Sequence, residues 1–249
     1  LVLNELPEKN IEKNTTIIFA HGFGQLKHNF SKKFPQLNFT LLAPKAIASE
    51  MRELYKQGKS FPGAISLQYS NKKNDNEIYL RHIALKLGMS RPTTVTFEEE
   101  TICDLFSEQS LLCSLIPYGI RYAFEALRKR GIPAEMAFNE CLFESKLIIQ
   151  TLEKVGFEQF FEIISPNALI GGEKAKNSTE FQQLKVLFEN LLDDISSKKF
   201  YEEIENSSIT TLRNNVSKDW SSSEITHEWE RQRTFNREAL NEEMDDTST

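Results

Sequence analysis

Two different hydrophobic patterns make up this sequence, and the change between them near Phe97 constrains the fold more than any other feature. Before Phe97, short runs of apolar and β-branched residues alternate with helix-like stretches such as Glu77–Leu87. The strand-like runs are Thr15–Ala20, Asn38–Ala43, Ala64–Gln68 and Thr93–Phe97. Strands that alternate with helices are typical of a parallel sheet with helices packed on its faces. We therefore predict an α/β domain here.

After Phe97 the apolar residues recur at helical spacing over much longer stretches. Long helices are predicted at Glu98–Arg130, Ala134–Val155 and Thr179–Glu205, with breaks at Gly131–Pro133 and Ser165–Gly172. Beyond about Thr210 the sequence is polar, which predicts either an amphipathic helix that lies on the body or a loose tail. The expected organisation is an α/β domain over 1–97, an all-helical domain over 98–210 and a polar tail over 211–249.

The composition is ordinary and excludes some partners. Of 249 residues, 39% are hydrophobic and 27% are charged, which is enough to bury a core in one large or two modest domains. The net charge of -6 offers no basic field for phosphates, so nucleic acid is not an expected partner. Cys103, Cys113 and Cys141 form no C-x-x-C pair, and no secretory signal or membrane-spanning run is evident. We expect a reducing compartment, by default the cytoplasm, and no membrane partner.

Two residues that follow predicted strands are suited to proton transfer. His21 follows the strand that ends at Ala20, and Lys45 follows the strand that ends at Ala43 and Pro44. Because parallel strands end at the same edge of a sheet, we expect both side chains at the edge where open α/β sheets bind ligands. Each can exchange a proton or hold a negative charge. The alternative is a loop histidine and a solvated lysine without a role.

Two pairs of carboxylates lie four residues apart on predicted helices. Asp104 and Glu108 form the first pair, and Glu140 and Glu144 form the second. Side chains at this spacing project from one face of a helix. Apolar neighbours flank both pairs, so we expect partly buried carboxylates, which must be paired, protonated or bound to metal. Magnesium prefers such oxygen ligands. The alternative is two acidic, solvated helix faces.

The residues around the first pair carry a family resemblance. The string Glu99-Glu-Thr-Ile-Cys-Asp-Leu-Phe-Ser-Glu-Gln109 closely resembles the E-E-T-x-x-D-L-F-G-E-Q signature of ketol-acid reductoisomerases. Other segments follow in the family's order: Phe19-Ala-His-Gly-Phe23, Leu42-Ala-Pro-Lys45, Pro133–Glu144 and Ile164-Ser165. The resemblance runs from about Leu1 to Glu205. It implies a partial Rossmann-like nucleotide-binding domain followed by a knotted all-helical domain.

The same resemblance implies a metal site with two magnesium ions. Asp104 and Glu108 would be ligands from one subunit, with Asp104 bridging the ions, and Glu140 and Glu144 would be ligands from a second subunit. The active sites would therefore form in a homodimer or higher homo-oligomer. The position of Ser165 matches the serine that contacts the substrate in the family.

The resemblance also implies a reaction. Magnesium would drive an alkyl shift in a 2-hydroxy-2-acyl acid, 2-acetolactate or 2-aceto-2-hydroxybutyrate, and NADPH would reduce the product to a dihydroxy acid. His21 and Lys45 match the histidine and lysine of the family's A-H-G-F and A-P-K motifs, and Glu144 would exchange the proton. These steps belong to the synthesis of valine, isoleucine and leucine.

Several segments depart from the family pattern. Those that differ are Ala46–Ser49 for a G-P-G-H turn, Cys113–Leu115 for C-G-G, Phe143 for a histidine and Pro166–Gly171 for N-T-A-E-Y-G. No G-x-G-x-x-G nucleotide fingerprint occurs, since Gly22-Phe-Gly24 lacks the third glycine, so no cofactor-binding residue is assigned. The chain also opens at Leu1 without an initiator Met, as though cut inside a strand.

These departures leave alternatives open. The sequence is either a fragment of a longer chain or a shortened, divergent relative. The expected function is that of a ketol-acid reductoisomerase. The alternatives are a non-catalytic homologue that retains the dimeric helical body, and an unrelated protein whose carboxylates are solvated.

Overall fold

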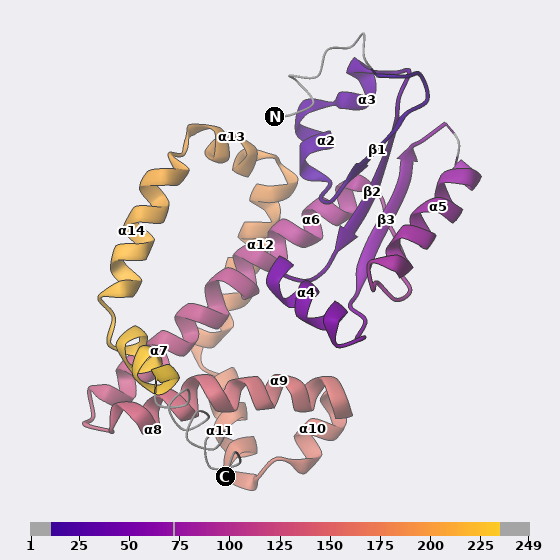
Figure 1. Ribbon diagram of the computed structural model, residues 1–249. Coiled ribbons are helices and arrows are strands. Elements are labelled where there is room, and N and C mark those ends of the chain that lie inside the picture. Colours follow the sequence, from indigo (N-terminus) through magenta and orange to yellow (C-terminus); the bar gives the residue numbers. More distant parts are fainter. Residues whose placement is uncertain (1–10, 72, 235–249) are drawn as a thin grey trace, which may run out of the picture. The chain divides into compact units, whose positions relative to one another are not determined.

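The computed structural model (Figure 1) describes residues 11–71 and 73–234. The chain forms two compact units, Leu1–Leu105 and Phe106–Thr249, and the division falls inside helix α6 (Phe97–Ser107). The domain boundary near Phe97 coincides with the first residue of α6 but stays a prediction. The proposed cut inside a strand at Leu1, and the last part of the predicted tail, lie outside the described residues.

The first unit contains a four-stranded sheet in the order β1 (Thr16–Phe19), β2 (Asn38–Pro44), β3 (Gly63–Tyr69) and β4 (Thr93–Thr94). β1 and β2 are parallel, and so are β3 and β4, but β2 and β3 are antiparallel. The α/β class is confirmed, while this one pairing differs from a uniformly parallel sheet.

The short connection between β2 and β3 explains their direction. Helix α4 (Ala48–Lys56) has nine residues and spans about 13 Å, whereas the seven residues of β2 span about 23 Å. The helix is therefore too short to return the chain to the far end of β2. Instead the chain enters β3 beside the end of β2, where the Lys45 amide donates to the carbonyl oxygen of Pro62 at 2.9 Å.

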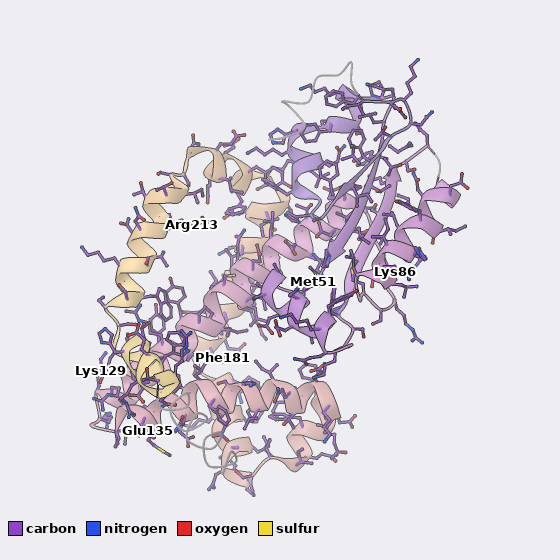
Figure 2. The ribbon with its side chains drawn as sticks, in the orientation of Figure 1. Met51, Lys86, Lys129, Glu135, Phe181 and Arg213 are labelled. Carbon is purple, nitrogen blue, oxygen red and sulfur yellow. The ribbon has the colours of Figure 1, made fainter. Side chains whose placement is uncertain are left out.

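Helices cover both faces of this sheet. On one face Leu42 and Ile65 pack with Leu80 of α5 (Lys73–Lys86), and Met51 of α4 joins them (Figure 2). On the other face Phe39 and Leu41 pack against α2 (Phe23–His28), α3 (Phe30–Lys33) and the start of α6. The first unit therefore has three layers, with β2 buried between the two sets of helices.

The predicted strand Thr93–Phe97 is mostly wrong. Only Thr93 and Thr94 pair with β3, and α6 begins at Phe97. The cause is a capping box: the Thr96 hydroxyl accepts from the Glu99 amide at 3.0 Å, and the Glu99 carboxylate accepts from the Thr96 amide at 2.7 Å. These two bonds satisfy amides at the helix start and end the extended chain.

In the described part of the second unit, 106–234, every regular element is a helix. The chain passes through α7 (Ile116–Arg128), α8 (Ala134–Phe138), α9 (Glu144–Val155), α10 (Phe157–Ile163), α11 (Pro166–Lys176), α12 (Thr179–Ser196), α13 (Lys199–Asn206) and α14 (Ile209–Ser221). Two π-helices, η2 (Glu108–Leu115) and η3 (Asn139–Phe143), lie directly before α7 and α9. The all-helical class is confirmed.

Individual breaks differ from the prediction in two places. The break at Gly131–Pro133 is present between α7 and α8. The break at Ser165–Gly172 is shorter than predicted, because the Ser165 hydroxyl caps α11 by accepting from the Ala168 amide at 3.2 Å. The predicted helix Thr179–Glu205 is divided at Lys198, whose φ of 65° is left-handed.

The polar segment after Thr210 is helical as far as it is described. Residues 224–234 follow α14 as a further helix, and Ile225 and Trp220 pack against Phe124 of α7 and Phe138 of α8. Arg121 pairs with Asp219 at 2.5 Å across the same contact. Across the described residues, no helix is both long and apolar enough to cross a bilayer.

Candidate active site

His21 and Lys45 lie at the same edge of the sheet. The register of the parallel strands pairs Phe19 with Leu41, so the chain leaves β1 and β2 on the same side. His21 lies two residues beyond β1, and Lys45 directly follows β2. The two strand ends therefore bring together side chains that are 24 positions apart in the sequence, as the alternating pattern predicts.

Both side chains meet the carboxylate of Glu100 in α6. Lys45 Nζ donates to Glu100 Oε1 at 2.7 Å, and His21 Nδ1 lies 3.1 Å from Glu100 Oε2. The Gly22 amide also donates to Oε2, at 2.7 Å. Only 1% of the Glu100 side chain is exposed, so nitrogen donors surround both oxygens of a buried carboxylate.

Glu100 is a site residue that the sequence analysis missed. It is the second glutamate of the E-E-T string and lies four residues before Asp104, on the same face of α6. A stripe at positions 100, 104 and 108 was the available signal, but Glu100 is also one of three consecutive glutamates at a helix start, where acidic residues are common.

Asp104 completes the cluster. Its Oδ1 accepts from Lys45 Nζ at 2.7 Å, and its Oδ2 lies 3.4 Å from His21 Nδ1. The Asp104 side chain is 28% exposed, in contrast to that of Glu100. Three predicted site residues, His21, Lys45 and Asp104, are therefore brought together within the first unit.

The pKa values of the cluster follow from this pairing. Burial of the His21 ring opposes its charge, but the hydrogen bond and charge of Glu100, with the charge of Asp104, outweigh burial and raise its pKa. Burial also opposes the charge of Lys45, yet its bonds to Asp104 and Glu100 raise its pKa. Burial of Glu100 acts to raise its pKa, but bonds from His21, Lys45 and Gly22 lower it overall. These shifts favour the charged forms of Glu100, His21 and Lys45.

The donor chemistry of the cluster fits a hard cation at Asp104 rather than at Glu100. Among residues 11–71 and 73–234, His21, Glu100 and Asp104 form the one group of three acidic, histidine or cysteine side chains close enough to share a metal ion. Both carboxylates have nitrogen partners, but Glu100 is buried with both of its oxygens bonded to nitrogen donors. Asp104 is partly exposed and offers the carboxylate oxygen that magnesium prefers.

The other predicted site residues belong to the second unit. Glu108 is the first residue of η2, Glu140 lies within η3, and Glu144 begins α9. All three side chains are exposed, so the expectation of partly buried carboxylates is wrong for them. Ser165 caps α11. Among the described residues, none of these three carboxylates belongs to a group of three side chains close enough to share a metal ion.

Both predicted metal pairs occur where the helix geometry changes. At the end of η2 the Ile116 amide donates to the carbonyl oxygen of Leu111, five residues earlier. At the end of η3 the Glu144 amide donates to the carbonyl oxygen of Asn139, also five residues earlier. Pro117 explains η2, because it has no N–H and its ring would meet the Cys113 carbonyl in an α-helix. Such π-segments occur often at functional sites.

Comparisons with known proteins agree with this arrangement. The family described as "Ketol-acid reductoisomerase, C-terminal domain" matches residues 97–241, and that described as "Acetohydroxy acid isomeroreductase, NADPH-binding domain" matches residues 2–92. Curated relatives named "Ketol-acid reductoisomerase (NADP(+))" include one from Methanococcus maripaludis, 30% identical over 78% of this chain, and one from Clostridioides difficile, 31% identical over 80%. The chain spans 58% and 60% of their lengths.

A solved structure shares the fold. The NADH-preferring ketol-acid reductoisomerase from an uncultured archean superposes with a TM-score of 0.76, covering 94% of this chain and 71% of its own, at 23% identity. Fold and cluster define a protein with a Rossmann-like α/β unit, an all-helical unit and acid–base groups at one sheet edge. Because both family matches together cover most of its residues, the chain belongs to the ketol-acid reductoisomerase family.

Proposed function

We propose that this chain acts as a ketol-acid reductoisomerase. It would convert 2-acetolactate or 2-aceto-2-hydroxybutyrate into the corresponding 2,3-dihydroxy acid in branched-chain amino-acid synthesis. The observation that carries the proposal is the cluster of His21, Lys45, Glu100 and Asp104, because it joins three separate segments of the chain that contain the family's motifs. The cytoplasm stays the expected compartment.

Four carboxylates would hold the metal. Asp104 and Glu108, with Glu140 and Glu144 from a second copy, offer the hard oxygen ligands that two magnesium ions require. When bound, magnesium would polarise the ketone and hydroxyl oxygens of the substrate and NADPH would supply hydride. The residues that bind NADPH are not assigned.

Lys45 and His21 have separable roles in this scheme. The Lys45 ammonium holds Asp104 Oδ1 in place and balances the charge of two adjacent carboxylates. His21 directs Nδ1 at the same carboxylates, so proton exchange with a substrate would go through Nε2. Glu144 would exchange the proton at the migrating centre, and Ser165 would bind the substrate.

Exposed apolar side chains in the second unit support a second copy as partner. In α9 to α12 the large apolar side chains with more than a third of their area exposed are Leu147, Ile148, Ile149, Phe157, Phe161, Ile163, Leu169, Ile170, Phe181, Val186, Leu187 and Leu192. Phe181 is labelled in Figure 2. A stable soluble domain rarely leaves so many apolar groups in water. We infer that they pack against a second copy, which also supplies Glu140 and Glu144.

The test is NADPH oxidation by the purified native protein with 2-acetolactate, with and without magnesium. We expect oxidation that requires both the substrate and the metal. The matched control is Asp104→Asn, which retains the size of the side chain but removes the charge that magnesium needs. A folded protein that shows no oxidation, or oxidation that is equal without magnesium, would contradict the proposal.

A further inference from the structure

Gly22 lies unusually close to helix α6. A Cβ atom at this position would fall 2.5 Å from the Phe97 carbonyl oxygen, 2.5 Å from the Thr101 hydroxyl and 3.0 Å from Glu100 Oε2. Its φ of -72° and ψ of -25° are open to any residue. Gly22 is therefore required for space and not for backbone freedom.

The atoms that surround Gly22 are themselves held in place. The Phe97 oxygen is backbone, and the Thr101 hydroxyl donates to it at 2.8 Å within α6. Both Phe97 and Thr101 are fully buried. An added methyl group would therefore have to move α6 away from the strand end, because its two closest contacts are a backbone oxygen and a hydroxyl that is hydrogen-bonded to that oxygen.

The close approach also brings a backbone donor to the buried carboxylate. The Gly22 amide donates to Glu100 Oε2 at 2.7 Å, as close as Lys45 Nζ lies to Oε1 on the other side. A backbone amide cannot rotate away as a side chain can. Gly22 thus gives the Glu100 carboxylate one fixed hydrogen bond that sets its orientation.

The fixed orientation is passed on to Asp104. Glu100 Oε1 holds Lys45 Nζ at 2.7 Å, and the same ammonium holds Asp104 Oδ1 at 2.7 Å. We propose that Gly22 is a positioning residue, which through Glu100 and Lys45 sets the place of the Asp104 carboxylate for magnesium. This inference rests on the proposed function, because it assigns Asp104 to the metal.

Two glycines in the same segment provide a matched test. Gly22→Ala places a methyl group against α6, whereas at Gly24 an added Cβ meets only the Phe19 ring, at 3.6 and 3.9 Å. We would measure magnesium affinity by titration calorimetry and the melting temperature by circular dichroism. We expect Gly22→Ala to weaken magnesium binding about 10–100-fold, as loss of an outer-shell partner does, and Gly24→Ala to change it less than about twofold. Equal affinity in the two folded variants would overturn the proposal.

If Gly22→Ala does not fold, Glu100→Asp decides the question. It retains the charge, but the shorter side chain cannot reach the Gly22 amide and Lys45 together. We expect the same loss of magnesium affinity, and affinity equal to that of the unchanged chain would overturn the proposal.

Failure of the proposed function would be distinguishable. If the unchanged chain binds no magnesium, the metal assignment fails. The positioning role is then decided by the carbon-13 chemical shift of the Glu100 carboxylate, which reports the hydrogen bonds that it accepts. A shift that moves in Gly22→Ala and not in Gly24→Ala would support positioning, and identical shifts in both would refute it.

Discussion

The two units of this chain differ in how far they bury their carboxylates and their apolar side chains. In the first unit the Glu100 carboxylate is buried and fully bonded, and Leu80 is inaccessible to water. In the second unit Glu140 and Glu144 are exposed, and large apolar side chains with more than a third of their area exposed are far more numerous than in the described part of the first unit. The first unit encloses and pairs its acidic and basic groups with its own side chains, whereas the second unit leaves carboxylates and many apolar groups at its surface.

The energetic reason lies in what each unit can bury. The sheet of the first unit has helices on both faces, so charges at its edge can be enclosed and paired. The described apolar core of the second unit is small and centres on Phe124, Phe138 and Ile225. In the proposed function, a second copy and metal ions would cover its remaining apolar side chains and carboxylates.

The largest expected effect comes from a carboxylate of the second unit. Glu140→Gln removes the charge of a proposed magnesium ligand from an exposed position, so the fold should persist while metal-dependent turnover is lost. Because loss of an outer-shell partner already costs about 10–100-fold, we expect a decrease of at least about 100-fold. The control is Glu153→Gln on α9, also exposed. Unchanged turnover in Glu140→Gln would show that the second unit does not need its carboxylates for metal.

A charge placed among the exposed apolar side chains of α9 to α12 tests whether a second copy covers them. Ile149 on α9 is 53% exposed, and Ile149→Asp would place a carboxylate in an interface that should be dry. We expect dimer dissociation, measured by analytical ultracentrifugation, to become at least about 100-fold easier, which is about 2.7 kcal/mol. Gln150→Asp introduces the same charge at the neighbouring position, where the native side chain is polar. If both variants dimerise alike, another surface forms the dimer.

Sequence patterns were sufficient for the parts of the site that depend on strand ends. His21 and Lys45 meet because parallel strands end together, and Asp104 follows from a long motif. For Glu100 the stripe at positions 100, 104 and 108 was too weak a signal, because its burial depends on Gly22 and Lys45, which are distant in the sequence. The alternation of strands and helices also does not show whether two neighbouring strands are parallel or antiparallel, so the antiparallel pairing of β2 and β3 was missed.

The π-helices show a second limit of periodicity. Predictions of the carboxylate pairs assumed α-helical spacing, yet Glu108 and Glu140 lie in segments with bonds five residues apart. Pro117 was a usable signal for the first segment, since a proline within a long helix demands some local change. For the second segment the sequence offers no comparable residue. The exposure of these carboxylates could not be predicted either. Their neighbours in the sequence are apolar, but those neighbours do not show whether the carboxylates face the core or the solvent.

Removal of the buried charge of Glu100 should lower the unfolding temperature of the first unit and leave that of the second unit unchanged. Glu100→Gln leaves Lys45 and His21 with Asp104 as the one remaining anion of the cluster, so we expect the first unit to lose roughly 1–3 kcal/mol of stability. Both tryptophans, Trp220 and Trp229, lie in the second unit, so their fluorescence reports that unit. The calorimetric transition of the first unit should move to lower temperature while the fluorescence transition does not. Glu98→Gln, an exposed neighbour on α6, is the control. A common shift in both signals would mean that the units unfold together.

The smallest expected effect concerns pH and the His21 ring. Because the folded pKa of His21 is raised above its ordinary value of 6.5, its pairing with Glu100 stabilises the fold fully below pH 6.5. This contribution is lost as the pH rises through the raised value. The side chain is 35% exposed, so the contribution should not exceed about 1 kcal/mol.

The variant His21→Gln isolates this contribution. The difference in unfolding free energy between the unchanged chain and the variant should shrink as the pH rises from about 6 to 8. The lowered pKa of Glu100 has the opposite sign, but it acts below the ordinary value of 4.5 and does not overlap this range. Added salt should reduce the difference further, since a partly exposed pair is screened. A difference that grows with pH would mean that the ring is neutral beside Glu100, and the first unit would then not hold its acids and bases as charged pairs.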